Sequence, residues 1–323
     1  MSSRPASGLV CAFLILALGT PAAAQELSLL AGTTAALGSD DESYSWTLEY
    51  LHRLHDHAAI SLSWLNEGHL PGHHRDGHCV QVWAGTAVLD PRLWLSAGIG
   101  PYRYFDTVEA EQGAGYADDH GWGAVLSIGS SWYGDSGWLF HLRANRIVTQ
   151  KAIDTTTLQL GLGYQLGEPA DAHRESAREA NSEITVLLGS TIVNSFESEQ
   201  DLAMSIEFRH RLGRHVEWTV AWLDEGDSRL VRRDGVTTQL WLVRSFFLDR
   251  VALGAGAGVY VGVDKYRKNQ PSEEGDEAVS LIITATASYR LGARWVTRAS
   301  WNRIATDYSR DTDVILAGVG YRF

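Results

Sequence analysis

The chain has 323 residues, of which 45% are hydrophobic and 20% are charged, and it carries 32 Gly, 12 Trp and 12 Tyr. Acidic residues outnumber basic ones by 39 to 27, giving a formal net charge of −12. A protein that binds nucleic acid needs a basic face to neutralise phosphates, so this balance argues against a nucleic-acid partner.

The first 24 residues have the pattern of an export signal. Arg4 precedes an apolar stretch over residues 8–19, and Ala22, Ala23 and Ala24 supply small residues for cleavage before Gln25. We therefore expect a signal peptide over residues 1–24 and Sec-type export. Cys79 is then the single cysteine of the exported chain, which excludes an internal disulfide.

Beyond the signal peptide, the chain alternates apolar with polar or small residues. Residues 157–166 illustrate the pattern, since Leu158, Leu160 and Leu162 share one face while Gln159 and Gly161 share the other. No run approaches the roughly 18 apolar residues that a membrane-spanning helix requires. A strand that is apolar outside and small or polar inside is what the wall of a lipid-facing barrel needs.

Sixteen such segments are predicted, joined by connections that alternate between short turns and longer polar loops. The expected strands are 26–36, 43–53, 58–67, 78–89, 92–105, 121–133, 137–147, 156–166, 183–193, 202–212, 215–224, 236–248, 250–263, 278–290, 294–304 and 313–323. The longer connections, at 37–42, 67–77, 106–120 and 148–155, are expected at one end of the structure, opposite both chain ends.

The last segment carries the most specific signal. Ile315, Val319 and Tyr321 alternate with small or polar residues, and the chain finishes on Phe323. This pattern resembles the final strand of bacterial outer-membrane β-barrels, read there by the barrel-insertion machinery. The resemblance implies the outer membrane of a Gram-negative bacterium, with membrane lipids and lipopolysaccharide as neighbours. A secreted β-sandwich would not explain the aromatic residues near strand ends, such as Tyr44 and Trp138.

The sequence also contains an internal duplication. At an offset of 158, residues 64–106 match residues 222–264 at 16 of 43 positions, and the matches form blocks. Clustered matches over this length indicate a repeated unit. Each unit has eight predicted strands, the smallest number that forms such a barrel.

Two arrangements of the repeat are open at this point. The favoured one is two tandem eight-stranded barrels, over residues 25–166 and 183–323, joined by a polar periplasmic linker at 167–182. The alternative is a single sixteen-stranded barrel, which would conduct small solutes as porins do. Small residues on the inferred inner face, such as Gly161 and Gly163, favour the narrow lumen of the first arrangement.

Alternation also places charged residues on the inner face. A charge inside a barrel must be paired or solvated, so each copy is expected to hold compensating ion pairs. The predicted pairs are Glu49 with Arg53 or Arg143 in the first copy, and Glu207 with Arg211 or Arg298 in the second. Such groups form either a salt-bridged plug, the interpretation we favour, or a polar path.

A second group of polar residues is predicted at the outer rim, where it could bind a sugar or a phosphate, or clasp the loop ends. In both copies the group contains an acid, a base and an amide. Its members are Glu67, Arg75, Asp76, Asp106, Asn145 and Arg146 in the first copy, and Glu225, Arg233, Asp234, Asp264, Asn302 and Arg303 in the second.

Metal and catalytic signals are weak. His69, His73, His74 and His78 could bind a transition metal, but the second copy lacks histidine at the matching positions, so no metal or cofactor is assigned. No catalytic residues are assigned either, because no Ser–His pair recurs in the two copies, although lipid A or phospholipid modification stays as an alternative. The sequence thus predicts a structural or surface-binding protein of the cell envelope.

Overall fold

The computed structural model describes residues 25–109, 115–166, 180–247, 249–265 and 276–323. The predicted signal peptide at 1–24 and residues 167–179 of the predicted linker lie outside these ranges. Within the described ranges, no helix is long and apolar enough to span a membrane.

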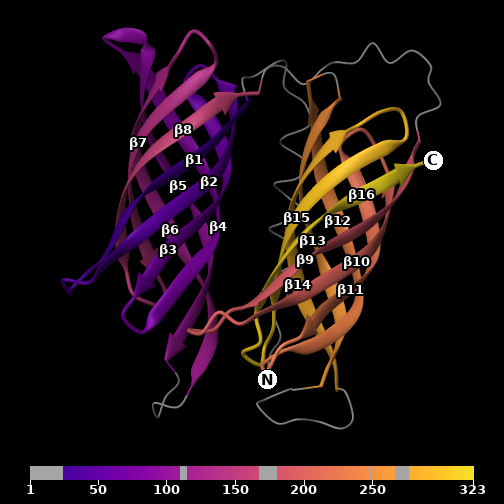
Figure 1. Cartoon of the computed structure of the whole chain (residues 1–323). Helices are drawn as coiled ribbons and strands as arrows, with labels where there is room; N and C mark the ends of the chain where they lie inside the picture. Colours follow the sequence, from indigo (N-terminus) through magenta and orange to yellow (C-terminus); the bar gives the residue numbers. More distant parts are fainter. Residues whose placement is uncertain (1–24, 110–114, 167–179, 248, 266–275) are drawn as a thin grey trace, which may run out of the picture. The chain divides into compact units, whose positions relative to one another are not determined.

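The first eight strands close into an antiparallel barrel, drawn from indigo to magenta in Figure 1. Each strand pairs with the next along the chain, and β1 pairs with β8, so the sheet has no free edge. The strands are β1 (Gln25–Ala36), β2 (Glu42–His55), β3 (Ala58–Leu70), β4 (His73–Val88), β5 (Asp90–Glu109), β6 (Tyr116–Tyr133), β7 (Trp138–Thr149) and β8 (Thr155–Gln165).

The second eight strands form another closed antiparallel barrel, in which β9 pairs with β16. They are β9 (Ser182–Val193), β10 (Gln200–Arg211), β11 (Val216–Asp227), β12 (Arg232–Phe246), β13 (Val251–Asp264), β14 (Asp276–Arg290), β15 (Trp295–Ala305) and β16 (Thr312–Arg322). The alternative of a single sixteen-stranded barrel is therefore wrong, because the strands that would join the two halves are paired within their own barrels.

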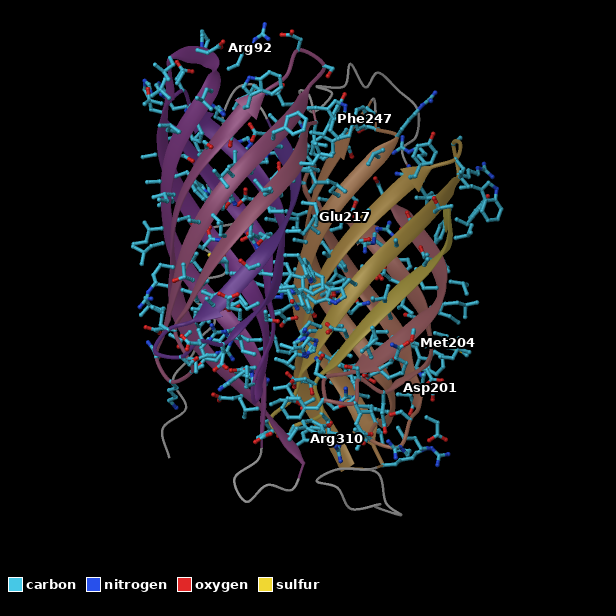
Figure 2. All side chains as sticks on the ribbon, turned by 60° about the vertical axis from the view of Figure 1, so that its left-hand side comes forward. Arg92, Asp201, Met204, Glu217, Phe247 and Arg310 are labelled. Carbon is cyan, nitrogen blue, oxygen red and sulfur yellow. The ribbon has the colours of Figure 1, made fainter. Side chains whose placement is uncertain are left out.

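The predicted alternation separates the two faces of each barrel. On β8, Leu158 and Leu160 are 57% and 69% exposed, whereas Thr157 and Gln159 are fully buried in the lumen. On β10, Leu202 and Ile206 are exposed while Ser205 and Glu207 are buried, and Figure 2 shows Met204 pointing away from the barrel axis. A polar interior inside an apolar wall is the arrangement of a transmembrane up-and-down barrel.

The two ends of each barrel differ. The turn end of the first barrel carries both ends of the β1–β8 unit and the connections at 56–57, 89 and 134–137. The loop end carries the connections at 37–41, 71–72 and 150–154, together with the end of β5 and the start of β6. The second barrel has the same division, and Figure 2 shows Phe247 at its turn end and Arg310 at its loop end.

One predicted loop is largely strand. Residues 67–77 are polar and were expected to form a loop, but β3 continues to Leu70 and β4 begins at His73. The register shifts between Asn66 and His69, and Gly68 has a φ of 70°, so a bulge lets the ladder continue beyond the predicted strand end.

Because each barrel satisfies all its strand edges internally, we expect a chain that ends at Leu166 after export to fold by itself. The refolded half should show strand-rich circular dichroism and should migrate differently on a gel with and without heating, as closed barrels do. A half that stays unfolded while the intact chain folds would contradict this expectation.

Candidate functional site

A buried Arg–Glu pair lies at the loop end of the first lumen, and we call this group the first clasp (Glu67, Arg75, Tyr102 and Thr155). Arg75 Nε donates to Glu67 Oε1 at 2.7 Å, and Arg75 Nη2 donates to Glu67 Oε2 at 2.5 Å. Tyr102 and Thr155 also donate to the Glu67 carboxylate. A bidentate pair with further donors satisfies the carboxylate fully, as a buried charge requires.

The same arrangement recurs in the second barrel as the second clasp (Glu225, Arg233, Tyr308 and Thr312). Arg233 Nε and Nη2 donate to the two Glu225 oxygens at 2.5 and 2.8 Å, and Thr312 donates to Glu225 at 2.5 Å. Arg233 Nη1 also donates to the Tyr308 hydroxyl at 2.8 Å.

Each clasp ties down the last connection of its barrel. Arg75 Nη1 donates to the Ile153 carbonyl at 2.5 Å, and Arg233 Nη2 donates to the Arg310 carbonyl at 3.4 Å. The connection at 306–311 thus folds over the second lumen, and burial there raises the pKa of Tyr308 to about 12. Arg75 and Arg233 thus each bind a carboxylate and a loop carbonyl. These contacts close the loop end of each lumen.

The two rim aspartates also face inward beside the clasps. Asp106 is 1% exposed and its Oδ2 lies 2.8 Å from His73 Nδ1, whereas Asp264 is fully buried with its Oδ2 4.0 Å from Arg233 Nη1. Val231 occupies the position of His73 in the second copy, so the two carboxylates lie beside different groups.

The other predicted rim residues do not join the clasps. Asn145 lies deeper in the lumen, where it accepts from Ser127 and donates to Thr157, both at 2.7 Å. Asn302 has the matching place and accepts from Thr284 at 2.9 Å. Strand alternation places the remaining four predicted residues on the outer face. There Asp76 accepts from Trp64 at 3.3 Å, and Arg146 lies 3.6 Å from Asp154. Arg303 pairs with Asp313 at 2.8 Å, and Asp234 lies next to Arg233 on β12.

A second layer of charge lies nearer the middle of the first lumen. Arg143 donates to both Glu49 oxygens, at 2.7 and 2.8 Å, and its guanidinium carbon lies 4.6 Å from the centre of the Trp83 ring. Arg53 does not join this pair. It lies 3.5 Å from Glu26 and donates to Tyr133 near the turn end.

The second lumen uses different pairs, and the predicted partners of Glu207 are wrong. Arg209 donates to Glu207 at 3.0 Å and to Glu217 at 2.9 Å, while Arg298 donates to Glu183 at 2.8 Å. Arg211 lies 4.0 Å from Glu217. The partner of each lumen arginine therefore depends on where the strand register places it, and not on the charge pattern alone.

A tryptophan ring supports the central guanidinium in both barrels. Trp83 and Trp241 are repeated residues, and the Arg209 carbon lies 4.3 Å from the Trp241 ring centre. The arginine comes from β7 in the first barrel and from β10 in the second. The repeat therefore preserves the contact between a cation and an aromatic ring while the strand that supplies the cation has changed.

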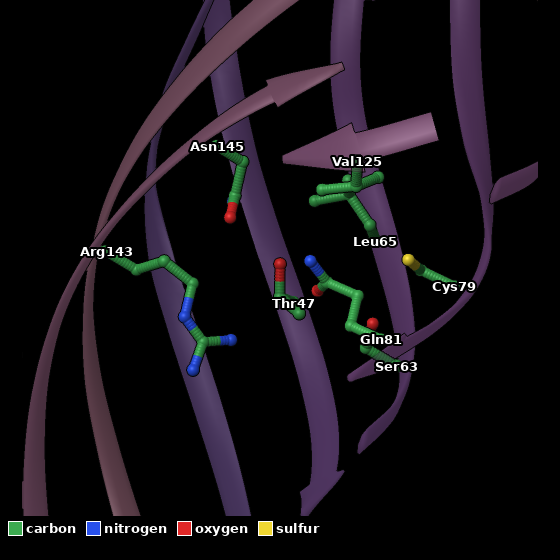
Figure 3. Close-up of a pocket in the computed structure, with 8 residues that line it drawn as sticks. All are labelled: Thr47, Ser63, Leu65, Cys79, Gln81, Val125, Arg143 and Asn145. Atoms are coloured by element: carbon green, nitrogen blue, oxygen red, sulfur yellow. The ribbon is translucent and has the colours of Figure 1, made fainter. Parts of the chain in front are cut away.

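Polar side chains fill the space between these layers. Gln81 donates to Ser127 at 2.8 Å, and Thr47 donates to Gln159 at 3.0 Å. Figure 3 shows a small cavity among them, lined by Thr47, Ser63, Leu65, Cys79, Gln81, Val125, Arg143 and Asn145. Its volume of about 10 Å³ for the centre of a water-sized sphere is room for about one water molecule.

One Ser–His arrangement lies near the turn end of the first lumen and was not found from the sequence. Ser28 Oγ lies 3.0 Å from His141 Nε2, and Ser131 Oγ lies 2.8 Å from His141 Nδ1. All three residues are buried, and Arg298 replaces His141 in the second copy. The partners lie on β1, β6 and β7, so only the strand order of the barrel brings them together.

The histidines of residues 69–78 do not converge on one point. The rings of His69 and His74 lie 3.9 Å apart, but His73 turns inward to Asp106 and His78 packs against Phe105. Among the residues that the structure describes, no group of three His, Cys, Asp or Glu side chains could hold a metal ion.

No protein-family model matches the chain, and no curated protein matches it. Among solved structures, it is similar to Neisserial surface protein A at 11% identity, over 45% of this chain and 99% of that chain, with a TM-score of 0.36. Ail, the attachment invasion locus protein of Yersinia pestis, is 18% identical over 45% and 99%, with a TM-score of 0.35. The translocator domain of the autotransporter NalP from Neisseria meningitidis is 14% identical over 98% and 93%, with a TM-score of 0.25.

Proposed function

We propose that this protein is an integral outer-membrane protein of a Gram-negative bacterium, with a structural or surface-binding role in the cell envelope. The observation that carries the proposal is the filling of both lumens by paired charges and polar side chains. Glu49–Arg143 and Glu207–Arg209 lie across the middle, and the two clasps lie across the loop ends.

The apolar outer walls support the membrane location. A closed barrel satisfies every backbone hydrogen bond internally, and its wall needs no other covering than lipid. The predicted signal peptide at 1–24 and the terminal Phe323 fit export followed by insertion through the barrel-insertion machinery. The loop ends then face the outside, because both ends of each eight-strand unit lie at the turn ends.

The functional surface of such a protein is its exterior. The clasp residues Glu67, Arg75, Glu225 and Arg233 bind one another and close the lumens, so a surface-binding role falls to the outer wall and the loops. Membrane lipids and lipopolysaccharide are the partners that these surfaces meet.

Conductance in a planar bilayer tests the proposal. The intact chain, refolded and inserted, should give no steady ohmic steps, because paired charges lie across the middle and the loop end of both lumens. An open sixteen-stranded porin in the same bilayers serves as the positive control. Steady steps of porin size from this chain would overturn the proposal in favour of a channel.

A further inference from the structure

Two histidines face each other at the loop end of the first barrel, and we call them the histidine pair (His69 and His74). His69 on β3 lies directly opposite His74 on β4 in the strand register. Their ring centres are 3.9 Å apart, with an angle of 35° between the ring planes. His69 is exposed and His74 is partly exposed, so both rings can be reached from outside the barrel.

A bulge in β3 brings His69 to this position. The register shifts between Asn66 and His69, where β3 contains one residue more than β4. The extra residue reverses the alternation of β3, so the His69 side chain faces the same side as the residue opposite it. The Gly68 N–H donates to Asn66 Oδ1 at 3.0 Å within the bulge. The His69 N–H donates to Ser43 Oγ on β2 at 2.8 Å, which holds the backbone beside the ring.

The second barrel has the same bulge with different side chains. Gly226 has a φ of 83°, and the register again shifts, between Asp224 and Asp227. The repeats of the histidine pair are Asp227 and Arg232, which lie opposite each other with Arg232 Nε 3.3 Å from Asp227 Oδ2. Opposite charges at paired positions stabilise a hairpin. Two imidazoles cannot form such an ion pair, but a metal ion that accepts a lone pair from each ring would link the same two strands.

The spacing of the two rings suits one shared ion. An imidazole nitrogen binds zinc at about 2.0–2.1 Å, so two nitrogens on the same ion lie about 3 Å apart. Rings whose centres are 3.9 Å apart can reach that spacing by side-chain rotation, without movement of the strands. The Tyr44 ring lies beside His69, with ring centres 5.7 Å apart, and limits the rotation of that imidazole. A ligating imidazole uses one nitrogen and leaves the other for a hydrogen bond that orients the ring.

The pair supplies two ligands, and the neighbouring histidines add none. His73 turns inward, where its Nδ1 lies 2.8 Å from Asp106 Oδ2. His78 packs against Phe105 on β5. Within the described part of the chain, no set of three His, Cys, Asp or Glu side chains could hold an ion, so water would take the remaining positions. Imidazole suits Cu²⁺, Ni²⁺ and Zn²⁺, and the usual order of affinity places Cu²⁺ first among these ions.

We propose that His69 and His74 bind one divalent transition-metal ion, Cu²⁺ most tightly, through one ring nitrogen from each strand. The ion cross-links β3 and β4 at the loop end. This inference goes beyond the proposed envelope role and does not depend on it, because both ligands belong to one hairpin that the closed barrel holds in register. The site is specific to the first barrel, since an ion pair occupies the same place in the second.

Titration of the intact, refolded chain with Cu²⁺ in detergent micelles tests the site. Isothermal titration calorimetry should show one Cu²⁺ bound per chain, and its electron paramagnetic resonance (EPR) spectrum should show coupling to two imidazole nitrogens. The double variant His69→Asp and His74→Arg copies the ion pair of the second barrel, and its mobility shift on heating shows that it is folded. This variant should bind Cu²⁺ about tenfold more weakly and lose the two-imidazole signal.

Two further double variants serve as control and converse. The variant His55→Ala and His57→Ala removes another pair of neighbouring histidines, whose ring centres lie 6.2 Å apart at the turn end, and should leave Cu²⁺ binding unchanged. The converse variant, Asp227→His and Arg232→His, places a histidine pair on the second barrel. It should bind a second Cu²⁺ with the same EPR spectrum.

Equal Cu²⁺ binding by the wild type and by the variant His69→Asp and His74→Arg would overturn the proposal. A wild-type spectrum with coupling to a single nitrogen would also overturn it, because the two rings would then not share the ion. Loss of binding in the variant His55→Ala and His57→Ala would have the same meaning, since the ion would then lie at the turn end. The micelle measurement requires neither a membrane location nor a closed lumen, so its failure is separate from a channel detected in the bilayer experiment.

Discussion

Replacing Arg233 by Met is expected to lower the free energy of unfolding of the second barrel by about 3–5 kcal/mol. The substitution removes both hydrogen bonds to the fully buried Glu225 and the contacts with Tyr308 and the Arg310 carbonyl. The buried Glu225 carboxylate then loses the cation that pairs with both of its oxygens, so much of its desolvation is uncompensated. Denaturant unfolding of the refolded protein in lipid vesicles, followed by tryptophan fluorescence and gel mobility, measures the loss.

The neighbouring residue is a matched control. Arg232 has a 45% exposed side chain and lies 3.3 Å from the exposed Asp227, so Arg232→Met should change stability by no more than about 0.5 kcal/mol. Arg75→Met should repeat the large loss in the first barrel. The double variant Glu225→Leu and Arg233→Met should recover part of it, since Glu225 is then no longer a buried charge without its cation, whereas Asp264 still loses Arg233. If Arg232→Met and Arg233→Met lowered the free energy of unfolding equally, the buried clasp would contribute no more to stability than an exposed ion pair does.

The clasp also illustrates what could be predicted from the sequence. The repeat of Glu67 and Arg75 as Glu225 and Arg233 identified the pair, and eight-residue spacing across a turn suggested that the two residues clasp the loop ends. Period-two alternation predicted the strands because a barrel wall imposes opposite environments on successive residues. The repeat then favoured eight strands per barrel, and the pairing of β1 with β8 bears this out.

The ion pairs in the middle of the lumens were harder to predict. Alternation places Glu49, Arg143, Glu207 and Arg298 inside, but it does not specify which residues meet across the lumen. Arg209, two residues after Glu207, was missed although the same alternation places it on the inner face of β10. The Ser28–His141 contact joins β1 to β7, and only the order and stagger of strands around the barrel determine such a contact.

The predicted loop boundaries were wrong for a different reason. Polar residues in 67–77 were interpreted as a loop because soluble loops are polar, yet strands that extend past the membrane are equally polar on both faces. The surroundings of His78 were missed for the same reason, since His78 was considered only as one of four histidines in a loop. In the structure its neighbours are Arg103 and Phe105 on β5, which the sequence separates from it by about 25 residues.

Replacing Gly258 by Ala is expected to lower the free energy of unfolding by about 3 kcal/mol, at the upper end of the usual range for overpacking. A Cβ at this position would lie 1.9 Å from the Thr238 carbonyl oxygen and 2.7 Å from Gln239 Cα. Both atoms belong to the backbone of β12, so no side-chain rotation can relieve the clash. The neighbouring strand would have to move, and in a closed barrel that displacement passes to every other strand.

The duplication supplies a replicate and the turns supply a control. Gly100 is the repeat of Gly258, and its Cβ would lie 1.8 Å from the Val80 carbonyl oxygen, so Gly100→Ala should destabilise the first barrel similarly. Gly213 and Gly292 lie in turns with no atom within 4 Å of an added Cβ, and Ala at either should stay within about 0.5 kcal/mol of the wild type. The same unfolding measurement in vesicles compares all four. If Gly258→Ala were as stable as Gly213→Ala, the close approach of β12 and β13 would not be a feature of the folded barrel. A loss confined to the inward glycines would show that their missing side chains let a barrel of only eight strands curve tightly enough to close.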